Sequence, residues 1–347
     1  MSPPFVSAPF VSPPFVTATA VSRTFTPSVP LTARVLATLS GRAGERTVHA
    51  VDDVSLTLTK GEALGLVGES GCGKTTLGRM IAGILPPSAG TLAIDGTSVM
   101  STGAHPRKST TRVQMVFQDP FASLDPRMRI GDTLMEGPVH HGLVGRAAAQ
   151  DYVRGWLAQV GLDPDYAGRY PHQFSGGQRQ RVAIARALAM QPDVLVCDEP
   201  VASLDVSIQA QIINLFLKLR RELNLTLLFI SHDLSVVRHL CDRVAIMYLG
   251  RIVEEGPTAE VYGDPRHPYT LGLLNSVPKL VLADGERARF TPIAGELPSP
   301  LAPPSGCHFH GRCPWVEARC RVERPALRPV GPGRTAACHF PRSEAPE

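Results

Sequence analysis

Short apolar segments recur along the chain at the length of buried β-strands. The first alternates apolar with polar residues, as a strand with one exposed face does. The later segments are apolar except for Thr226. The predicted strands are residues 48–58, 63–67, 194–197, 225–230 and 244–248.

Between these strands, apolar residues repeat with the period of an α-helix. Leu77, Met80 and Ile81 begin one repeat, which continues to Ile84 and ends at two prolines, and a second covers residues 208–223. The apolar face of the second helix is Ile208, Ile212, Leu215, Phe216 and Leu219. Because strands alternate with helices, the pattern predicts an α/β fold with a parallel sheet.

Other segments depart from this alternation. Residues from about 119 to 190 contain no convincing strand and are expected to form a mainly helical insert. Proline and glycine become frequent after about residue 263, so we treat residues 264–347 as a separate C-terminal extension. Residues 1–30 repeat Pro, Ser, Phe and Val, and repeated proline predicts a disordered tail there. Residues 31–263 remain as the main domain.

The overall composition limits the classes of function. The 347 residues carry a net charge of +4, which is too weak to indicate a nucleic-acid partner. No apolar run approaches the roughly 18 residues that span a bilayer, so a role at a membrane would be peripheral.

The strand at residues 63–67 runs into a glycine-rich loop with the spacing of a P-loop. Its glycines expose backbone N–H groups to phosphate oxygens, and the following helix adds the partial positive charge of its N-terminus. Lys74 is expected to reach the β- and γ-phosphates of ATP, and Thr75 to bind Mg²⁺. The residues assigned to nucleotide binding are Gly68, Glu69, Ser70, Gly71, Cys72, Gly73, Lys74, Thr75 and Thr76.

Two acidic residues end the apolar segment 194–197. Asp198 is expected to hold Mg²⁺, as the second acidic element of P-loop nucleotidases does. Glu199 would then face the γ-phosphate and polarise the attacking water. Without the P-loop upstream, such a pair could equally be a solvated strand end.

A serine and two glycines precede the predicted helix at residues 182–189. Ser175 can cap this helix, and Gly176 and Gly177 expose its N-terminal amides. The segment from Phe174 to Arg181 resembles the signature of ABC proteins, with Phe174 where leucine is commoner. Two further residues resemble family motifs in the family's order: Gln118 the Q-loop glutamine and His232 the switch histidine.

This resemblance implies an ABC nucleotide-binding domain with an antiparallel β subdomain and a helical subdomain. It also implies that two cassettes pair head to tail, so the signature serves an ATP bound mostly to the partner. The signature residues concerned are Ser175, Gly176, Gly177 and Gln178. Glu199 would act as general base, His232 would contact the γ-phosphate, and Gln118 would sense Mg²⁺ and the water.

The adenine contact departs from the family pattern. ABC proteins usually stack adenine on an aromatic ring shortly before the P-loop. Residues 31–48 contain no aromatic residue, and His49 lies late in register, so the contact stays unassigned.

The C-terminal extension resembles that of oligopeptide and dipeptide importer ATPases, through residues 266–270, residues 295–300 and the cysteines that follow. The resemblance implies peptide import, with nickel, glutathione or other small solutes as alternatives. It implies transmembrane permease subunits, a second ABC ATPase (a paralogue more often than a second copy) and, indirectly, a substrate-binding protein. The chain would lie peripherally on the cytoplasmic face of the cell membrane.

A soluble ABC ATPase acting on DNA or ribosomes is the main alternative. DNA-repair members contain long heptad coiled coils and translation-type members carry two cassettes, and this sequence shows neither. The intact Lys74, Asp198, Glu199 and His232 disfavour a non-catalytic regulatory cassette.

Four of the seven cysteines, spaced C-x5-C-x6-C-x17-C, are Cys307, Cys313, Cys320 and Cys338. Disulfides explain them poorly in an intracellular ATPase. Four thiolates suit a [4Fe–4S] cluster or a structural zinc ion, although the close cysteine pairs usual for zinc are missing. His308, His310 and His339 leave a mixed zinc site open. A cluster is preferred because some members of the resembling subfamily are associated with one, and unmetallated thiols remain a third alternative.

Overall fold

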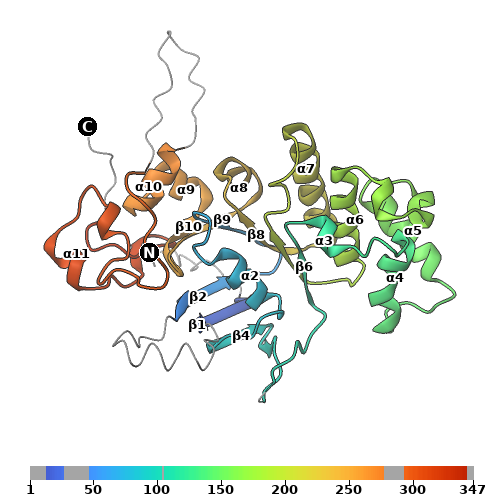
Figure 1. Cartoon of the computed structure of the whole chain (residues 1–347), viewed down its shortest axis with the longest axis horizontal. Helices are drawn as coiled ribbons and strands as arrows, with labels where there is room; N and C mark the ends of the chain where they lie inside the picture. Colours follow the sequence, from blue (N-terminus) through green and yellow to red (C-terminus); the bar gives the residue numbers. More distant parts are fainter. Residues whose placement is uncertain (1–12, 27–46, 104, 277–292, 342–347) are drawn as a thin grey trace, which may run out of the picture.

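The computed structural model describes residues 13–26, 47–103, 105–276 and 293–341. A central sheet crosses the molecule (Figure 1). A helical arm lies on one side of it, and the C-terminal region lies on the other.

An eight-stranded sheet forms this centre. In spatial order its strands are β11 (Arg328–Gly331), β12 (Arg334–Ala336), β10 (Arg251–Pro257), β9 (Arg243–Tyr248), β3 (Ala63–Val67), β8 (Thr226–Ser231), β7 (Val194–Asp198) and β6 (Val113–Val116). The strands from β9 to β6 are parallel, so their carboxyl ends lie at one edge. At that edge an α/β sheet usually binds its ligand.

The two faces of this sheet pack against different elements. Along β3, Leu64 and Leu66 join one core, and Ala63 and Val67 join another. The helices are α2 (Lys74–Ile81), which packs on the first core, and α7 (Val206–Leu223) and α8 (Leu234–Leu240), which pack on the second.

A four-stranded antiparallel sheet completes the first core. Its spatial order is β2 (Val48–Leu58), β1 (Val16–Phe25), β4 (Ala89–Ile94) and β5 (Thr97–Ser98). Its buried side chains join those of α2 in one cluster.

The prediction of a disordered tail over residues 1–30 is wrong for residues 16–25, which form β1. This strand pairs with β2 on one side and β4 on the other, and buries Val16, Ala18 and Val21. Both partners are distant in sequence, so the local proline-rich composition gave no sign of the pairing. Residues 1–12 and 27–30 lie outside the described part of the chain.

The helical arm extends from residue 119 to residue 190 and contains only helical elements. They are α3 (Pro120–Ser123), α4 (Ile130–His140), α5 (Ala149–Gln159), two short 3₁₀ turns (Pro164–Gly168 and Pro171–Gln173) and α6 (Gly176–Leu188). No helix among the described residues is both long and apolar enough to cross a membrane.

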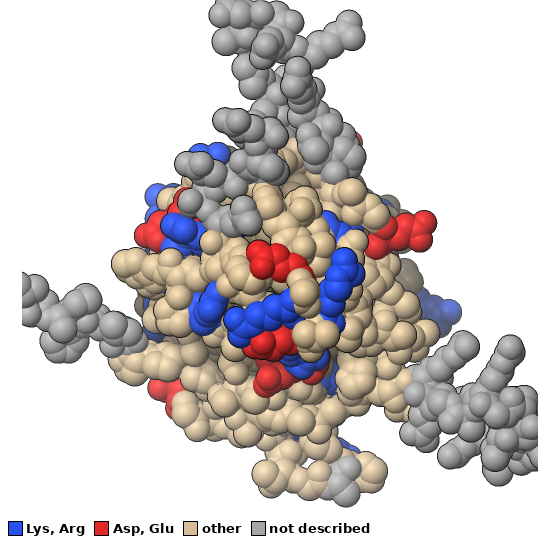
Figure 2. Space-filling model, turned by 90° about the vertical axis from the view of Figure 1, so that its left-hand side faces the viewer, with Lys and Arg blue, Asp and Glu red and all other residues tan. Residues whose placement is uncertain are grey.

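The C-terminal region is not structurally separate. Its strand β12 pairs with β10, so residues expected in an extension widen the main sheet. Helix α9 (Thr258–Gly263) precedes this region, whose own helical elements are α10 (Pro268–Asn275), the 3₁₀ turn η3 (His310–Arg312) and α11 (Ala318–Val322). On the side of the molecule where this region lies, basic and acidic side chains are interspersed (Figure 2).

Candidate nucleotide-binding and catalytic site

The loop between β3 and α2 depends on its glycines, two of which leave no room for a side chain. A Cβ on Gly68 would lie 2.2 Å from the Met247 carbonyl oxygen, and one on Gly73 would lie 2.1 Å from that of Ala50. Gly71 has open space around it but a φ of +80°, which L side chains rarely adopt. Close packing on β9 and β2 therefore fixes the loop between β3 and α2.

Lys74 is the first residue of α2, and its side chain folds back over the loop. Its Nζ donates to the carbonyl oxygens of Gly68 at 2.7 Å and Glu69 at 3.0 Å. The residue is only 3% exposed. A buried ammonium in this position supplies the positive charge that nucleotide phosphates require.

Thr75 and Asp198 bring two hard oxygen ligands together although they lie 123 positions apart in the chain. The Thr75 hydroxyl donates to Asp198 Oδ1 at 2.9 Å. Burial raises the pKa of Asp198, while the hydrogen bond from Thr75 and the charges of Arg79 and Lys74 lower it. A cation at this point would offset the cost of burying the carboxylate, so the donor set fits Mg²⁺.

Glu199 lies at the centre of the predicted catalytic residues. Gln118, just after β6, donates from Nε2 to Glu199 Oε2 at 3.4 Å. His232, just after β8, places Nδ1 3.1 Å from the same oxygen. The Glu199 side chain is 13% exposed and that of His232 is 55% exposed. Three residues that are distant in sequence therefore meet at the carboxyl edge of the sheet.

The backbone of Glu199 is strained, with a φ of +46° in the left-handed region. Its N–H donates to the Ile230 carbonyl at 3.0 Å, which ties the turn after β7 to β8. Such conformations in non-glycine residues cost free energy and concentrate at functional sites. Here the strained backbone holds the carboxylate beside Gln118 and His232.

The signature residues lie elsewhere, at the N-terminus of α6 in the helical arm (Figure 1). Ser175 and Gln178 cap each other reciprocally, with Gln178 N donating to Ser175 Oγ at 3.3 Å and Ser175 N to Gln178 Oε1 at 3.0 Å. Ser175 and Gly176 are exposed. A Cβ on Gly177 would lie 2.5 Å from the Ile208 side chain, whereas one on Gly176 would make only an ordinary contact at 3.7 Å.

An aromatic residue near the nucleotide loop escaped the sequence analysis. Phe25 ends β1, pairs with Val48 of β2 and is 39% exposed. Two residues farther along β2, the Ala50 carbonyl packs against Gly73 of the loop. Counting back from the P-loop missed Phe25 because residues 27–46 separate it from β2. A signal was present, since apolar positions 16, 18 and 21 lead to this aromatic ring.

The four C-terminal cysteines come together in the structure. All four line one small cavity of about 20 Å³, along with His267, His310 and His339. Burial raises the pKa of Cys307 to about 11, and the other three thiols add to the shift. Among the described residues, no three His, Cys, Asp or Glu side chains are arranged to hold a single metal ion.

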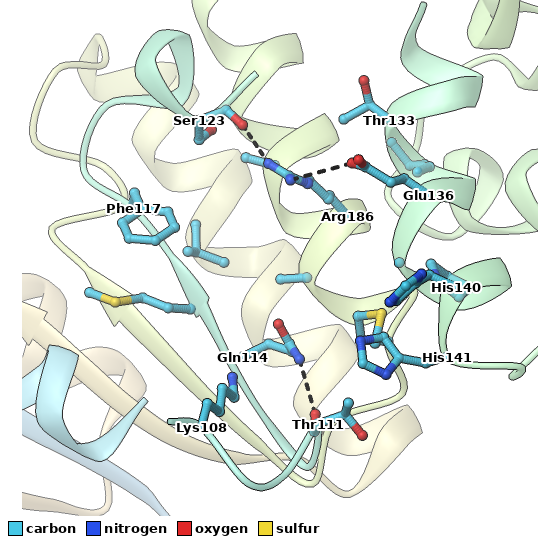
Figure 3. Close-up of a pocket in the computed structure, with 18 of the residues that line it drawn as sticks. Lys108, Thr111, Gln114, Phe117, Ser123, Thr133, Glu136, His140, His141 and Arg186 are labelled. Atoms are coloured by element: carbon cyan, nitrogen blue, oxygen red, sulfur yellow. Dashed lines mark hydrogen bonds and ion pairs between the residues drawn. The ribbon is translucent and has the colours of Figure 1, made fainter. Parts of the chain in front are cut away.

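A groove of about 980 Å³ lies between β6 and the helical arm (Figure 3). Lys108 and Gln114 line its sheet side, and His140, His141 and Arg186 line its helical side. Within the helical side, Arg186 Nη1 donates to the Ser123 carbonyl at 2.5 Å and Nη2 lies 4.0 Å from Glu136 Oε2. Phe117, the residue before Gln118, also lines the groove.

The comparisons with known proteins agree with this geometry. Residues 51–202 match the ABC transporter family. A solved structure of cbiO1 from Clostridium perfringens, part of an ABC transporter complex, is 25% identical and covers 72% of this chain and 90% of that one, with a TM-score of 0.56. A solved structure of a dimeric ATP-binding cassette bound to ADP and Pi is 26% identical. It covers 70% of this chain and 98% of that one, with a TM-score of 0.57. The fold is thus that of an ABC-type ATPase, as predicted.

Sequences that are more similar to this chain narrow the class of ABC-type ATPase to which it belongs. Residues 253–320 match the C-terminal region of oligopeptide/dipeptide transporters. The oligopeptide transport ATP-binding protein AppF of Bacillus subtilis is 48% identical over 84% of this chain and 90% of that protein. A putative peptide import ATP-binding protein of Brucella ovis is 49% identical over 84% of this chain and 92% of that protein. The chain belongs to the family of ABC transporter ATP-binding subunits with the oligopeptide/dipeptide C-terminal region.

Proposed function

We propose that this chain hydrolyses ATP with Glu199 as general base and that the cycle powers peptide import. The observation that carries the catalytic assignment is the contact of Glu199 Oε2 with both Gln118 and His232. The carboxylate takes a proton from the attacking water, and Gln118 orients that water. His232 contacts the γ-phosphate from the other side.

The remaining residues of the site hold the nucleotide. Lys74 leaves the loop carbonyls and pairs with the β- and γ-phosphates, and the loop N–H groups bind their oxygens. Thr75 and Asp198 hold Mg²⁺, with Gln118 beside it. The ion, when bound, neutralises charge that develops on the phosphates.

Phe25 is our candidate for the adenine contact. Its ring is exposed at the strand end nearest Gly73, and Arg23 lies 4.9 Å from its centroid on the same strand. An exposed aromatic ring provides a stacking surface for a base.

A second cassette completes the site. The exposed Ser175 and Gly176 stand on the helical arm, apart from the loop at α2. They bind an ATP held by the partner cassette, and that partner's signature binds the ATP held here. A paralogous cassette is the proposed partner, as the family resemblance implies.

The proposed coupling to membrane subunits uses the groove beside Gln118 (Figure 3). A segment of a permease subunit that fills it would contact Phe117 and the helical arm together. Movement of the arm would then reach Glu199 through Gln118. The chain would thus act at the cytoplasmic face of the membrane, with a substrate-binding protein delivering the peptide.

For the four cysteines we propose a [4Fe–4S] cluster with a structural role. The thiols of Cys307, Cys313, Cys320 and Cys338 surround one cavity, and cysteine thiolates are the usual ligands of such clusters. Iron and acid-labile sulfide assays on anaerobically purified protein test this. Protein that contains neither would overturn it.

Transport assays test the proposed cargo. The chain is co-expressed with its permease subunits and second cassette, and the complex is reconstituted into vesicles with its binding protein. Uptake of a labelled peptide should require ATP and should stop in the E199Q variant. ATP-dependent uptake of nickel or another small solute, with no peptide uptake, would contradict the peptide assignment.

A further inference from the structure

The C-terminal region contacts the phosphate-binding loop through two side chains that converge on Glu69. Arg312 donates to both carboxylate oxygens of Glu69, from Nη1 at 2.7 Å and from Nη2 at 2.9 Å. The backbone N–H of Glu69 donates to the Tyr269 hydroxyl at 2.9 Å. Glu69 is the second residue of the loop, and Arg312 lies 243 positions later in the chain.

Both contacting side chains are held firmly by their surroundings. Tyr269 is fully buried, and the Arg312 side chain is only 5% exposed. Tyr269 packs with two other aromatic rings, and its centroid lies 4.6 Å from that of Tyr248 and 5.4 Å from that of Phe309. Arg312 lies 6.0 Å from the Tyr248 and Phe309 centroids. The guanidinium therefore approaches Glu69 from a packed and preorganised position.

The Arg312–Glu69 ion pair neutralises a negative charge that the loop carries beside its phosphate-binding groups. A carboxylate at Glu69 adds negative charge to a loop that must bind negative phosphates. A bidentate guanidinium cancels this charge and fixes its direction. Glu69 is also linked to the catalytic machinery, because its carbonyl accepts from Lys74 at 3.0 Å.

We propose that Arg312 and Tyr269 are positioning residues of the ATP site. They hold Glu69 in place, and Arg312 neutralises a carboxylate that would otherwise repel the nucleotide phosphates. The C-terminal region is thus part of the ATP-binding apparatus as well as a mark of the transporter family. This inference rests on ATP binding at Gly68–Thr75 and is independent of the cargo and of any cluster at the cysteines.

The test is a set of equilibrium titrations of the full-length chain with a fluorescent ATP analogue and Mg²⁺. R312Q leaves Glu69 unpaired and should weaken binding about tenfold, on the scale of one uncompensated charge at moderate dielectric. E69Q removes the carboxylate that Arg312 compensates, so it should weaken ATP binding less than R312Q does. E69Q/R312Q should bind ATP no more weakly than E69Q, because a double-mutant cycle reveals the coupling of a contacting pair. R312K keeps the positive charge but loses the bidentate geometry, so its ATP affinity should fall between those of R312Q and the unmodified chain.

E69D provides a second route if R312Q does not fold. It keeps the negative charge in the loop but withdraws it from Arg312, so it should bind ATP more weakly than E69Q. A purely structural role for Glu69 predicts that E69D binds ATP more tightly than E69Q, because aspartate is the more conservative change.

The exposed pair Arg319–Glu323 is the matched control. It is also bidentate, at 2.6 and 2.7 Å, and lies in the same region, but its side chains are 53% and 52% exposed. R319Q and R319Q/E323Q should leave ATP affinity unchanged. Normal affinity in R312Q would overturn the proposal. Equal losses of ATP affinity in E69Q, R312Q and E69Q/R312Q that parallel losses of thermal stability would also overturn it.

Discussion

The phosphate-binding surface and the second surface, at the signature, which is proposed to face a partner cassette, differ in how many of their polar groups are hydrogen-bonded within the chain. At the phosphate-binding loop, Lys74, Thr75 and Glu199 all have hydrogen-bond partners within the chain. At the signature, Ser175 and Gly176 are exposed, and their contacts serve mainly to begin α6. The first surface is therefore a nearly assembled half-site. At the second surface, the start of α6 is formed, and the exposed residues proposed to bind the partner's ATP face outward. Under the proposed function, this difference predicts that one cassette binds ATP alone and that turnover requires two.

The largest expected effect tests the assembled half. E199Q removes the general base but retains an oxygen and an amide near Gln118 and His232, so ATP binding should survive. Turnover should fall by about a thousandfold, within the range for loss of a catalytic base with its associated contacts. ATPase rates and ATP-dependent dimerisation measured together check this. Normal turnover would exclude Glu199 as the base.

The next test concerns the outward-facing half. G176A has room for its methyl group within the chain, since the nearest atom is a Leu204 side-chain carbon at 3.7 Å. We expect stability and ATP affinity of the single chain to be retained while turnover of the assembled pair falls by about a hundredfold, as when one transition-state donor is lost.

The control for G176A is G155A, which adds the same methyl group on α5 where no atom lies within 4 Å. It should leave turnover unchanged. Equal losses in G155A and G176A would indicate a general effect on the helical arm and would remove the distinction between the two surfaces.

A smaller effect is expected at the adenine end of the assembled half. F25A removes a stacking surface worth about 1 kcal/mol, which corresponds to about fivefold weaker ATP binding. Titration of the full-length chain with ATP and with a base-free triphosphate should show the loss for ATP alone. Phe121 is a comparable exposed ring at 60% exposure, and F121A should bind ATP normally. Equal affinities in F25A and the unmodified chain would leave the adenine contact elsewhere.

The smallest effect separates structure from function within the signature. G177A places a Cβ 2.5 Å from Ile208, so it should lower the free energy of unfolding by about 1 kcal/mol through overpacking. I208A should relieve this clash, giving a favourable coupling of about 1 kcal/mol in urea unfolding. Additive losses in the double variant would mean that the contact with Ile208 is not what requires glycine.

Sequence reasoning located the site more completely than it located the fold around it. The P-loop spacing, the acidic pair after an apolar segment and the capped helix start at Ser175 are local patterns, each readable within a few residues. Phe25 was missed because its place depends on pairing with Val48 across a long intervening segment. The same limitation misassigned β1, whose partners β2 and β4 lie later in the chain.

From the sequence alone, we could predict which chemistry is available: a phosphate cradle at Gly68–Thr75, an acidic pair suited to Mg²⁺ and water, and a segment that resembles the ABC signature. These patterns are short because hydrogen bonds within a turn or helix start link near neighbours. Only the tertiary structure brought Gln118 and His232 to one oxygen of Glu199, and Arg312 to Glu69 across 243 positions. Strand order and packing decide such contacts, and neither is encoded in a local pattern.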